Sequence, residues 1–100
     1  MMVVSMIQFI IELPDVTSLK EKRRVVQSLK QRLQNKFKLS AAEVDLHNSL
    51  GYCQIGAALV TNNKSYGEGV MQKVVLFVED QIPGRIRDIA IHSEIYSELY

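Results

Sequence analysis

The segment Met2–Leu13 constrains the fold most, because it is rich in valine, isoleucine and phenylalanine and is largely apolar on both alternating faces. A strand that is apolar on both faces lies in the interior of a sheet. Pro14 follows and cannot continue a central ladder, so the strand is predicted to end there. One face is expected to pack on helices through Ile7, Phe9 and Ile11, and the other carries Met2, Val4, Met6 and Ile10.

A capping motif and a hydrophobic stripe predict a helix after this strand. Ser18 followed three residues later by Glu21 is a capping box, which makes Ser18 the expected N-cap. Apolar residues then recur on one side at helical spacing. The helix is predicted to end near Asn35 or Lys38.

The rest of the chain is predicted to add three strands and a second helix. Alternation and turn residues indicate strands over Ala42–Asn48 and Tyr52–Thr61, a helix over about Lys64–Asp80, a turn at Pro83-Gly84, and a strand from Arg85 to about Glu94. Val44 and Leu46 form the apolar face of the first of these strands. Residues 95–100 are apolar enough to extend the last strand or to pack on a partner.

The order βαββαβ predicts an α+β, ferredoxin-like fold, in which two helices cover one face of a four-stranded antiparallel sheet. The chain has 100 residues, 47% of them apolar, and a formal net charge of +1. These values predict one domain over residues 1–100 and exclude a disordered chain. The uncovered sheet face is apolar, which favours a partner. We expect a homo-oligomer, such as a dimer, that buries Met2, Val4, Met6 and Ile10.

Cysteine usage and hydropathy predict the compartment. Cys53 is the single cysteine, so no intramolecular disulfide can form and a reducing compartment is expected. The longest apolar stretch is shorter than the ~20 residues that span a bilayer. It also lacks the flanks of a signal peptide. A cytoplasmic protein without a membrane partner is therefore predicted.

Charge is distributed unevenly along the chain. Residues 18–38 contain eight Lys or Arg and one acid, a charge of 8 − 1 = +7, whereas the remainder has four basic and ten acidic residues, or −6. Cations on one helix can neutralise backbone phosphates of RNA in a manner that is sensitive to salt and blind to sequence. A charged, solvated face is the alternative. The candidate phosphate-binding residues are Lys20, Arg23, Arg24, Lys30 and Arg32.

Lys22 is an exception within this basic segment, because helical spacing places it on the apolar side. One interpretation is that its alkyl stem lies along the core edge while the ammonium group reaches water. The other is a partly buried ion pair with Glu43 or Asp45. The sequence leaves both open.

Several chemistries lack the residues that they need. Cys53 lies on the apolar face of a strand with no adjacent histidine, which predicts an inert buried thiol. Glu43, Asp45 and His47 alternate along one strand, a pattern typical of a solvated face rather than of a metal site. Base stacking on the sheet would rely on Tyr52 alone. No catalytic residues, metal or cofactor are predicted.

The run Ser18–Val26 after a strand that ends Leu-Pro-Asp, then Asn35-Lys36-Phe37 and Ala42–Asp45, resembles the bacterial YlxP-like family of unknown function. The resemblance implies a ferredoxin-like fold and no established activity. Genes of this family often lie beside those of translation initiation factor two and ribosome-binding factor A, which implies a connection with translation or ribosome assembly.

Two hypotheses from different classes follow. The first is a non-enzymatic accessory protein that contacts RNA or the ribosome through the basic first helix. The alternative is a homo-oligomeric structural or small-ligand-binding module that assembles through the open sheet face. An enzyme is a third reading, but no residue pattern names a reaction.

Overall fold

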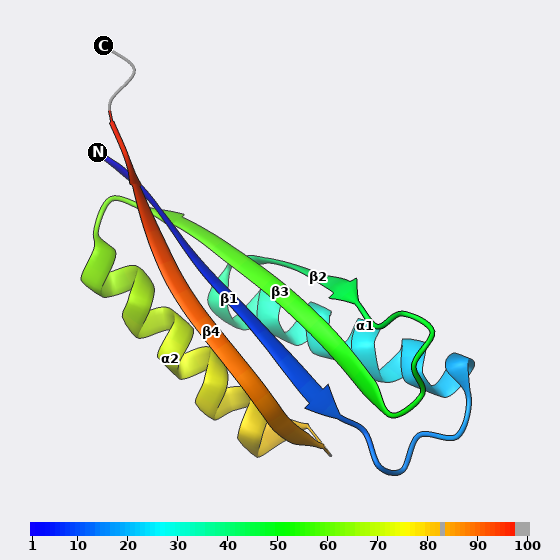
Figure 1. Ribbon diagram of the computed structural model, residues 1–100. Helices are drawn as coiled ribbons and strands as arrows, with labels where there is room; N and C mark the ends of the chain where they lie inside the picture. Colours follow the sequence, from blue (N-terminus) through cyan, green and yellow to red (C-terminus); the bar gives the residue numbers. More distant parts are fainter. Residues whose placement is uncertain (83, 98–100) are drawn as a thin grey trace.

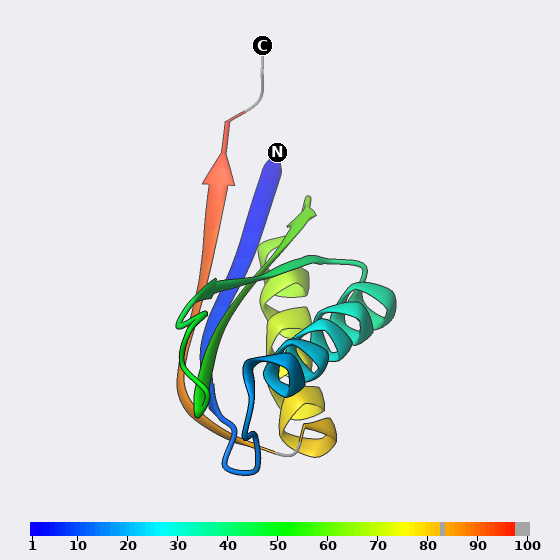
Figure 2. The ribbon, with the colours of Figure 1, turned by 90° about the vertical axis from the view of Figure 1, so that its right-hand side faces the viewer.

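The computed structural model describes residues 1–82 and 84–97 and has the element order βαββαβ. The elements are β1 (Met2–Glu12), α1 (Leu19–Phe37), β2 (Ser40–Asp45), β3 (Tyr52–Thr61), α2 (Lys64–Gln81) and β4 (Arg85–Tyr96). The strands form one antiparallel sheet in the order β2-β3-β1-β4. Both helices cover the same face of that sheet, and the other face is open (Figures 1 and 2). The predicted ferredoxin-like fold is confirmed.

The first strand lies in the interior of the sheet, as its two apolar faces predict. It pairs with β3 on one side and β4 on the other, so that Ile7 lies opposite both Ala57 and Ile91. Its odd-numbered residues face the helices and are buried, including Phe9. This register leaves the even-numbered side chains of β1 on the open face.

Local signals fix both ends of α1. The side chain of Ser18 accepts a hydrogen bond from the backbone N–H of Glu21, as in the predicted capping box. The carboxylate of Glu21 accepts from the N–H and the hydroxyl of Thr17. At the other end Lys38 adopts a left-handed conformation, with φ of 57°, and its N–H bonds to the carbonyl of Gln34. The helix therefore begins after the predicted N-cap and ends at Phe37, within the predicted range.

Gly67 and Gly56 allow neighbouring elements to pack closely, and neither glycine lies in a turn. A Cβ atom at Gly67 would lie 2.1 Å from the hydroxyl of Ser5, so the first turn of α2 can approach β1 only without a side chain there. Ser5 is fully buried and shares a 2.8 Å hydrogen bond with Ser93 of β4. Gly56 lies beneath the side chain of Val44, to which a Cβ atom would approach within 3.0 Å. The absence of a side chain at Gly56 therefore makes room for Val44 on the open face.

The prediction for β2 was wrong in its bounds and in its faces. The strand runs from Ser40 to Asp45 rather than over Ala42–Asn48, and its register shifts between Glu43 and Asp45. Val44 is 48% exposed, whereas Glu43 is partly buried on the helix side. The physical reason is that a buried cation lies beneath Glu43, so the polar side chain faces inward and the apolar one outward.

The last strand extends through Ile95 and Tyr96, which is one of the two alternatives that the sequence left open for this segment. Residues 98–100 of the predicted tail lie outside the described residues, as does Pro83 of the predicted turn. Gly84 packs closely against the end of β1, where a Cβ atom would lie 2.5 Å from the carbonyl oxygen of Glu12.

Candidate nucleic-acid interface

The exposed side of α1 concentrates cationic and amide side chains. The helix buries a stripe that includes Val26, Leu29 and Leu33 against the sheet and α2, so the opposite side faces solvent. A shallow groove of about 460 Å³ runs along that side. Its lining residues recur at helical spacing and are Lys20, Arg23, Arg24, Gln27, Ser28 and Gln31.

A second groove, of about 480 Å³, lies between α1 and β2. Arg23 and Gln27 border it as well as the first groove, and Lys30 adds a further cation. Its other side is formed by β2 and the following turn, through Ala42, Glu43 and His47. The two grooves therefore adjoin along one line of α1.

The structure brings four of the five candidate phosphate-binding residues to these grooves and leaves out the fifth. Lys20, Arg23 and Arg24 border the first groove, and Lys30 borders the second. Arg32 lines neither of them. Helical spacing grouped these cations on the side opposite the apolar stripe, and the lining of the grooves separates Arg32 from the rest.

Positive charge gathers along the grooved side of α1, and Glu43 is the acid that borders the second groove. Over residues 1–82 and 84–97, none of the five candidate cations forms an ion pair; the pairs found use Lys22, Arg87 and His92. Glu21 is engaged by Thr17, and Glu43 by Lys22. An anion that approaches α1 therefore meets donors that are not committed elsewhere.

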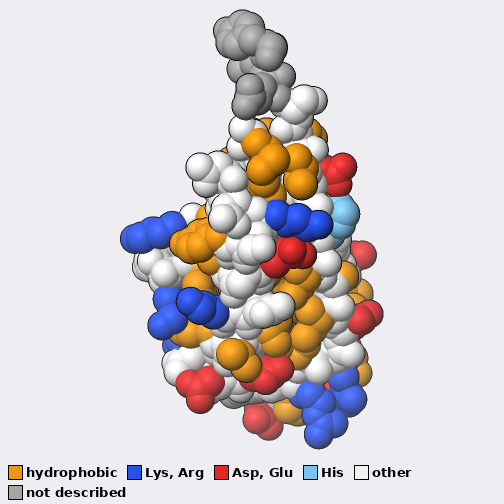
Figure 3. All heavy atoms as spheres, turned by 90° about the vertical axis from the view of Figure 1, so that its left-hand side faces the viewer, with side chains coloured by type: hydrophobic (Ala, Val, Ile, Leu, Met, Phe, Trp, Pro, Cys, Tyr) orange, Lys and Arg blue, Asp and Glu red, His pale blue; other side chains and the backbone are white. Residues whose placement is uncertain are grey.

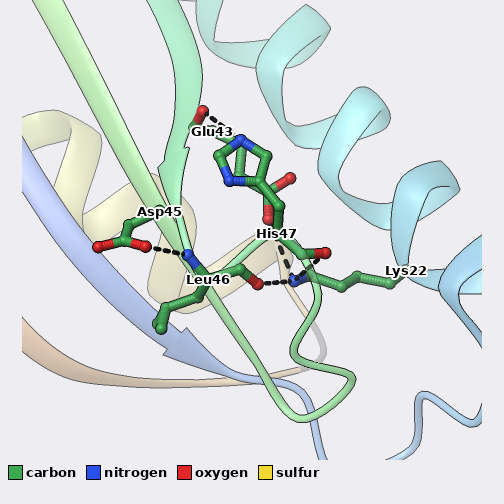
Figure 4. A network of polar contacts seen from close by, with 5 residues as sticks. All are labelled: Lys22, Glu43, Asp45, Leu46 and His47. Atoms are coloured by element: carbon green, nitrogen blue, oxygen red, sulfur yellow. Dashed lines mark hydrogen bonds and ion pairs between the residues drawn. The ribbon is translucent and has the colours of Figure 1, made fainter.

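Lys22 ties α1 to the end of β2, as Figure 4 shows. Its ammonium nitrogen lies 2.5 Å from the carbonyl oxygen of Leu46, 3.4 Å from that of His47 and 3.1 Å from the carboxylate of Glu43. The ammonium group donates hydrogen bonds to the two carbonyl oxygens, whereas Glu43 Oε2 accepts no hydrogen bond and contacts it as an ion pair. With 2% of the side chain exposed, the interpretation that the ammonium reaches water is wrong.

The other polar residues of this turn bond to its own backbone. Asp45 is not a partner of Lys22, because its carboxylate accepts from the N–H of Leu46 at 2.7 Å. Leu46 has a φ of 63°, a conformation that costs a leucine free energy and is held here by these contacts. His47 Nε2 lies 3.1 Å from the carbonyl oxygen of Glu43. The turn is thereby fixed against α1 and forms one wall of the second groove.

Sequence reasoning missed the amides of the first groove. Gln27 and Gln31 follow Arg23 and Arg24 at intervals of four and seven residues, so a helical projection of the basic segment would have placed them on the same side. Gln27 adds donors and acceptors where both grooves meet. His47, considered first as a metal ligand, borders the second groove.

Cys53 and the acidic and histidine side chains were considered above for nucleophilic and metal chemistry. Burial, and secondarily the charge of Glu43, raise the pKa of the Cys53 thiol to about 11, so the thiolate is scarce near neutral pH. No three His, Cys, Asp or Glu side chains of residues 1–82 and 84–97 are grouped so that they could hold a metal ion. In the same part of the chain neither helix combines the length and the hydropathy needed to span a bilayer.

The open sheet face is the other candidate surface. Met2 is 45% exposed, whereas Val4, Met6 and Ile10 are half-buried by their neighbours. A shallow apolar groove of about 380 Å³ crosses this face between β1 and β2. Side chains that contribute to it include Met6, Ala42, Val44 and Ala58. The sequence analysis missed Val44 here because the alternation predicted that the apolar face of β2 is the buried one, whereas Val44 is 48% exposed.

Comparison with known proteins gives a family and a fold. The family model described as "Protein of unknown function (DUF503)" matches residues 4–91. The chain is 34% identical over 65 residues to the uncharacterized protein YlxP of Bacillus subtilis (strain 168), a match that covers 65% of this chain and 71% of that protein.

Two solved structures share the fold at low sequence identity. A dimeric protein of unknown function and ferredoxin-like fold from Bacteroides fragilis matches with a TM-score of 0.56 and 15% identity, over 95% of this chain and 96% of that one. A protein from Arabidopsis thaliana matches with a TM-score of 0.52 and 10% identity, over 97% and 98% of the two chains.

Proposed function

The chain belongs to the DUF503 family of proteins of unknown function, and on this premise we propose that it is a non-enzymatic protein that binds the phosphate backbone of RNA through α1. The observation that carries the proposal is a set of four cations that border two adjoining grooves and have no ion-pair partner among the described residues. Lys20, Arg23 and Arg24 are exposed, and Lys30 is half-buried. The gene neighbourhood implied by the family resemblance favours RNA of the translation apparatus.

The type of contact follows from the side chains. Arginine donates two parallel hydrogen bonds to a phosphate group, and lysine adds a point charge. Gln27 and Ser28 can donate to phosphate or ribose oxygens, which positions the nucleic acid without reading its sequence. The open sheet face lacks the paired aromatic side chains on which RNA bases stack, so base recognition there is disfavoured.

The salt dependence of binding provides the first test. Neutralising about four phosphates releases condensed counterions, so affinity should fall on the order of a hundredfold between about 50 and 200 mM salt. The measurement is the fluorescence anisotropy of a labelled RNA hairpin, repeated with purified ribosomal subunits. Absence of binding at 50 mM salt refutes the proposal.

Charge-matched variants separate a local site from overall charge. Arg23→Glu with Arg24→Glu should abolish binding, whereas Lys64→Glu with Arg85→Glu changes the net charge equally at exposed positions outside α1 and should reduce it far less. Arg32→Glu should have a small effect, because Arg32 borders neither groove. Equal losses for both double variants would mean that no local site exists.

A second function has one observation in its favour. The apolar groove between Met6 and Val44 suits a small apolar ligand or the sheet of another copy, in a homo-oligomeric or ligand-binding module. Val44→Asp should then dissociate the oligomer or abolish ligand uptake. A protein that stays monomeric at high concentration in sedimentation velocity contradicts the oligomeric form.

A further inference from the structure

The strand β4 is an unprotected edge of the sheet. It occupies the end of the strand order β2-β3-β1-β4, so one row of its backbone N–H and C=O groups has no partner strand. It is 12 residues long, and from Arg87 to Tyr96 every side chain except that of Ser93 is exposed. The strand runs along the side of the molecule that Figure 3 presents, beside α2.

The usual protections of an edge are present on β2 and largely missing from β4. Edge strands are blunted by shortness, bulges, proline or lysine. The other edge, β2, has six residues and a register shift near its end. In β4 the register shift lies close to the start, opposite Ile10 and Ile11 of β1, and residues 88–96 continue without proline or lysine. This length of regular edge is a template for another strand.

Isoleucines line the side of β4 that faces the helix layer, and α2 leaves them uncovered. Ile89, Ile91 and Ile95 are 40%, 36% and 52% exposed. Hydrophobic side chains reach the surface along this side of the molecule, between charged groups (Figure 3). A strand added beside β4 would bring a second row of side chains against these isoleucines, which removes apolar area from water.

One central register matches the side chains of β4 with those of a second copy. Within one chain Asp88 Oδ1 accepts from the N–H of Ile89, and His92 Nε2 lies 2.7 Å from Glu94 Oε2, so the contact between copies uses the other carboxylate oxygen of Asp88 and Nδ1 of His92. In an antiparallel pair with its two-fold axis at Ala90, Asp88 lies opposite His92 of the other copy, and Ile89 lies opposite Ile91, each pair occurring twice. This register also overlaps 11 of the 12 residues of β4, from Arg85 to Ile95. An axis moved by one residue, to Ile91, places Asp88 opposite Glu94 and is disfavoured by like charge.

We propose that β4 pairs antiparallel with β4 of a second copy of this chain, about a two-fold axis at Ala90, so that the two sheets join into one of eight strands. Main-chain hydrogen bonds supply affinity, and the Asp88–His92 and Ile89–Ile91 pairs select the register. The surface is separate from the grooves of α1, so this proposal stands or falls independently of RNA binding.

Cysteine substitution tests the register. Residues directly opposite in an antiparallel pair have Cα atoms about 4.5–5.5 Å apart, within the range that a disulfide spans. Ala90→Cys should therefore give a covalent dimer with oxidised glutathione. His92→Cys is the matched control: it lies on the same strand and face, but Asp88 is expected opposite it. The unmodified chain, whose Cys53 is buried, should not crosslink.

Charge exchange tests the contact without altering the core. Sedimentation velocity of the unmodified chain should show a concentration-dependent dimer. Asp88→Lys should weaken the dimer at least tenfold, and adding His92→Asp should restore it. Ile89→Lys should give a monomer whose circular dichroism spectrum is unchanged, whereas Val44→Asp on the open face should leave the dimer intact.

Three results would overturn the proposal. A monomer at all accessible concentrations refutes β4 pairing. Crosslinking of His92→Cys as efficiently as Ala90→Cys refutes the register. Dissociation by Val44→Asp but not by Ile89→Lys would assign the contact to the open sheet face instead.

Discussion

Replacement of Lys22 by methionine tests the contact that fixes the wall of the second groove. Methionine preserves much of the length and apolar stem of lysine but removes the ammonium group. The carbonyl oxygens of Leu46 and His47 then lose a hydrogen-bond donor, and the carboxylate of Glu43 loses its cationic partner at 3.1 Å. The variant should unfold more readily, because these acceptors remain near the core without a partner.

The magnitude follows from burial. Removing one member of a buried ion pair costs about 3–5 kcal/mol. The side chain of Lys22 is 2% exposed, but that of Glu43 is 16% exposed and can regain some hydration. We therefore expect a loss at the lower end, about 3 kcal/mol, which corresponds to a fall of about 12–24 °C in the unfolding midpoint for a domain of this size.

Urea denaturation followed by circular dichroism measures this loss, since the chain has no tryptophan to report on unfolding. With a slope of about 1–3 kcal/mol per molar urea, the midpoint should fall by roughly 1–3 M at unchanged slope. Lys22→Met combined with Glu43→Leu should be more stable than the sum of the single losses predicts, because the stranded carboxylate is gone. A loss below about 1 kcal/mol for Lys22→Met would refute the reasoning.

Three further predictions concern stability. Gly67→Ala should destabilise the fold by about 1–3 kcal/mol, because the added methyl group overlaps with the hydroxyl of Ser5. Gly69→Ala meets nothing within 4 Å and should raise the unfolding midpoint, because alanine has a helix propensity up to about 1 kcal/mol better than glycine. A lower midpoint for both variants in thermal melts would contradict the packing argument. Folding raises the pKa of Cys53 from 9.0 to about 11, so the contribution of the thiol to the free energy of unfolding is fully present below pH 9 and is lost as pH rises through 11. Urea titrations at a series of pH values should show a shallower decline of this free energy with pH in Cys53→Ala. An equal decline in the variant and the unmodified chain would contradict this prediction. Ser18→Ala removes the acceptor for the N–H of Glu21 and should cost about 1 kcal/mol in the same assay, while an unchanged midpoint would mean that the cap is dispensable.

The sequence predicted those helices and strands that are marked by a nearby capping or turn residue. It also predicted the buried face where apolar residues recur with a regular period. Ser18 and Glu21 announce the start of α1, and the alternation along β1 gives its central place and its buried side. Five of the six elements lie close to their predicted ranges. These features depend on contacts within a few residues or on one period, so they can be read without the tertiary structure.

Long-range pairings decided what could not be predicted. Glu43 faces inward only because Lys22, 21 residues earlier, lies beneath it, and this pairing reverses the faces expected for β2. In the sequence Gly67 only lowers the helix propensity of α2. Its function is to let α2 pack against the hydroxyl of Ser5 in β1, which the sequence does not show. The cations of α1 were identified as a group, but separating Arg32 from the others required the lining of the grooves.

The partition of charge between α1 and the rest of the molecule has a consequence for encounters in solution. A segment of +7 and a remainder of −6 give the molecule a large electric dipole moment while its net charge stays near zero. In the field of a polyanion such a molecule experiences a torque rather than a strong net pull, so it is turned with α1 foremost before contact. Acids at the sheet edge opposite β2, such as Asp88 and Glu94 of β4, then lie away from the polyanion. Orientation is thus selected during approach. The field acts over a distance of about one Debye length, about 10 Å at 0.1 M salt, so raising the ionic strength should reduce the fraction of productive encounters.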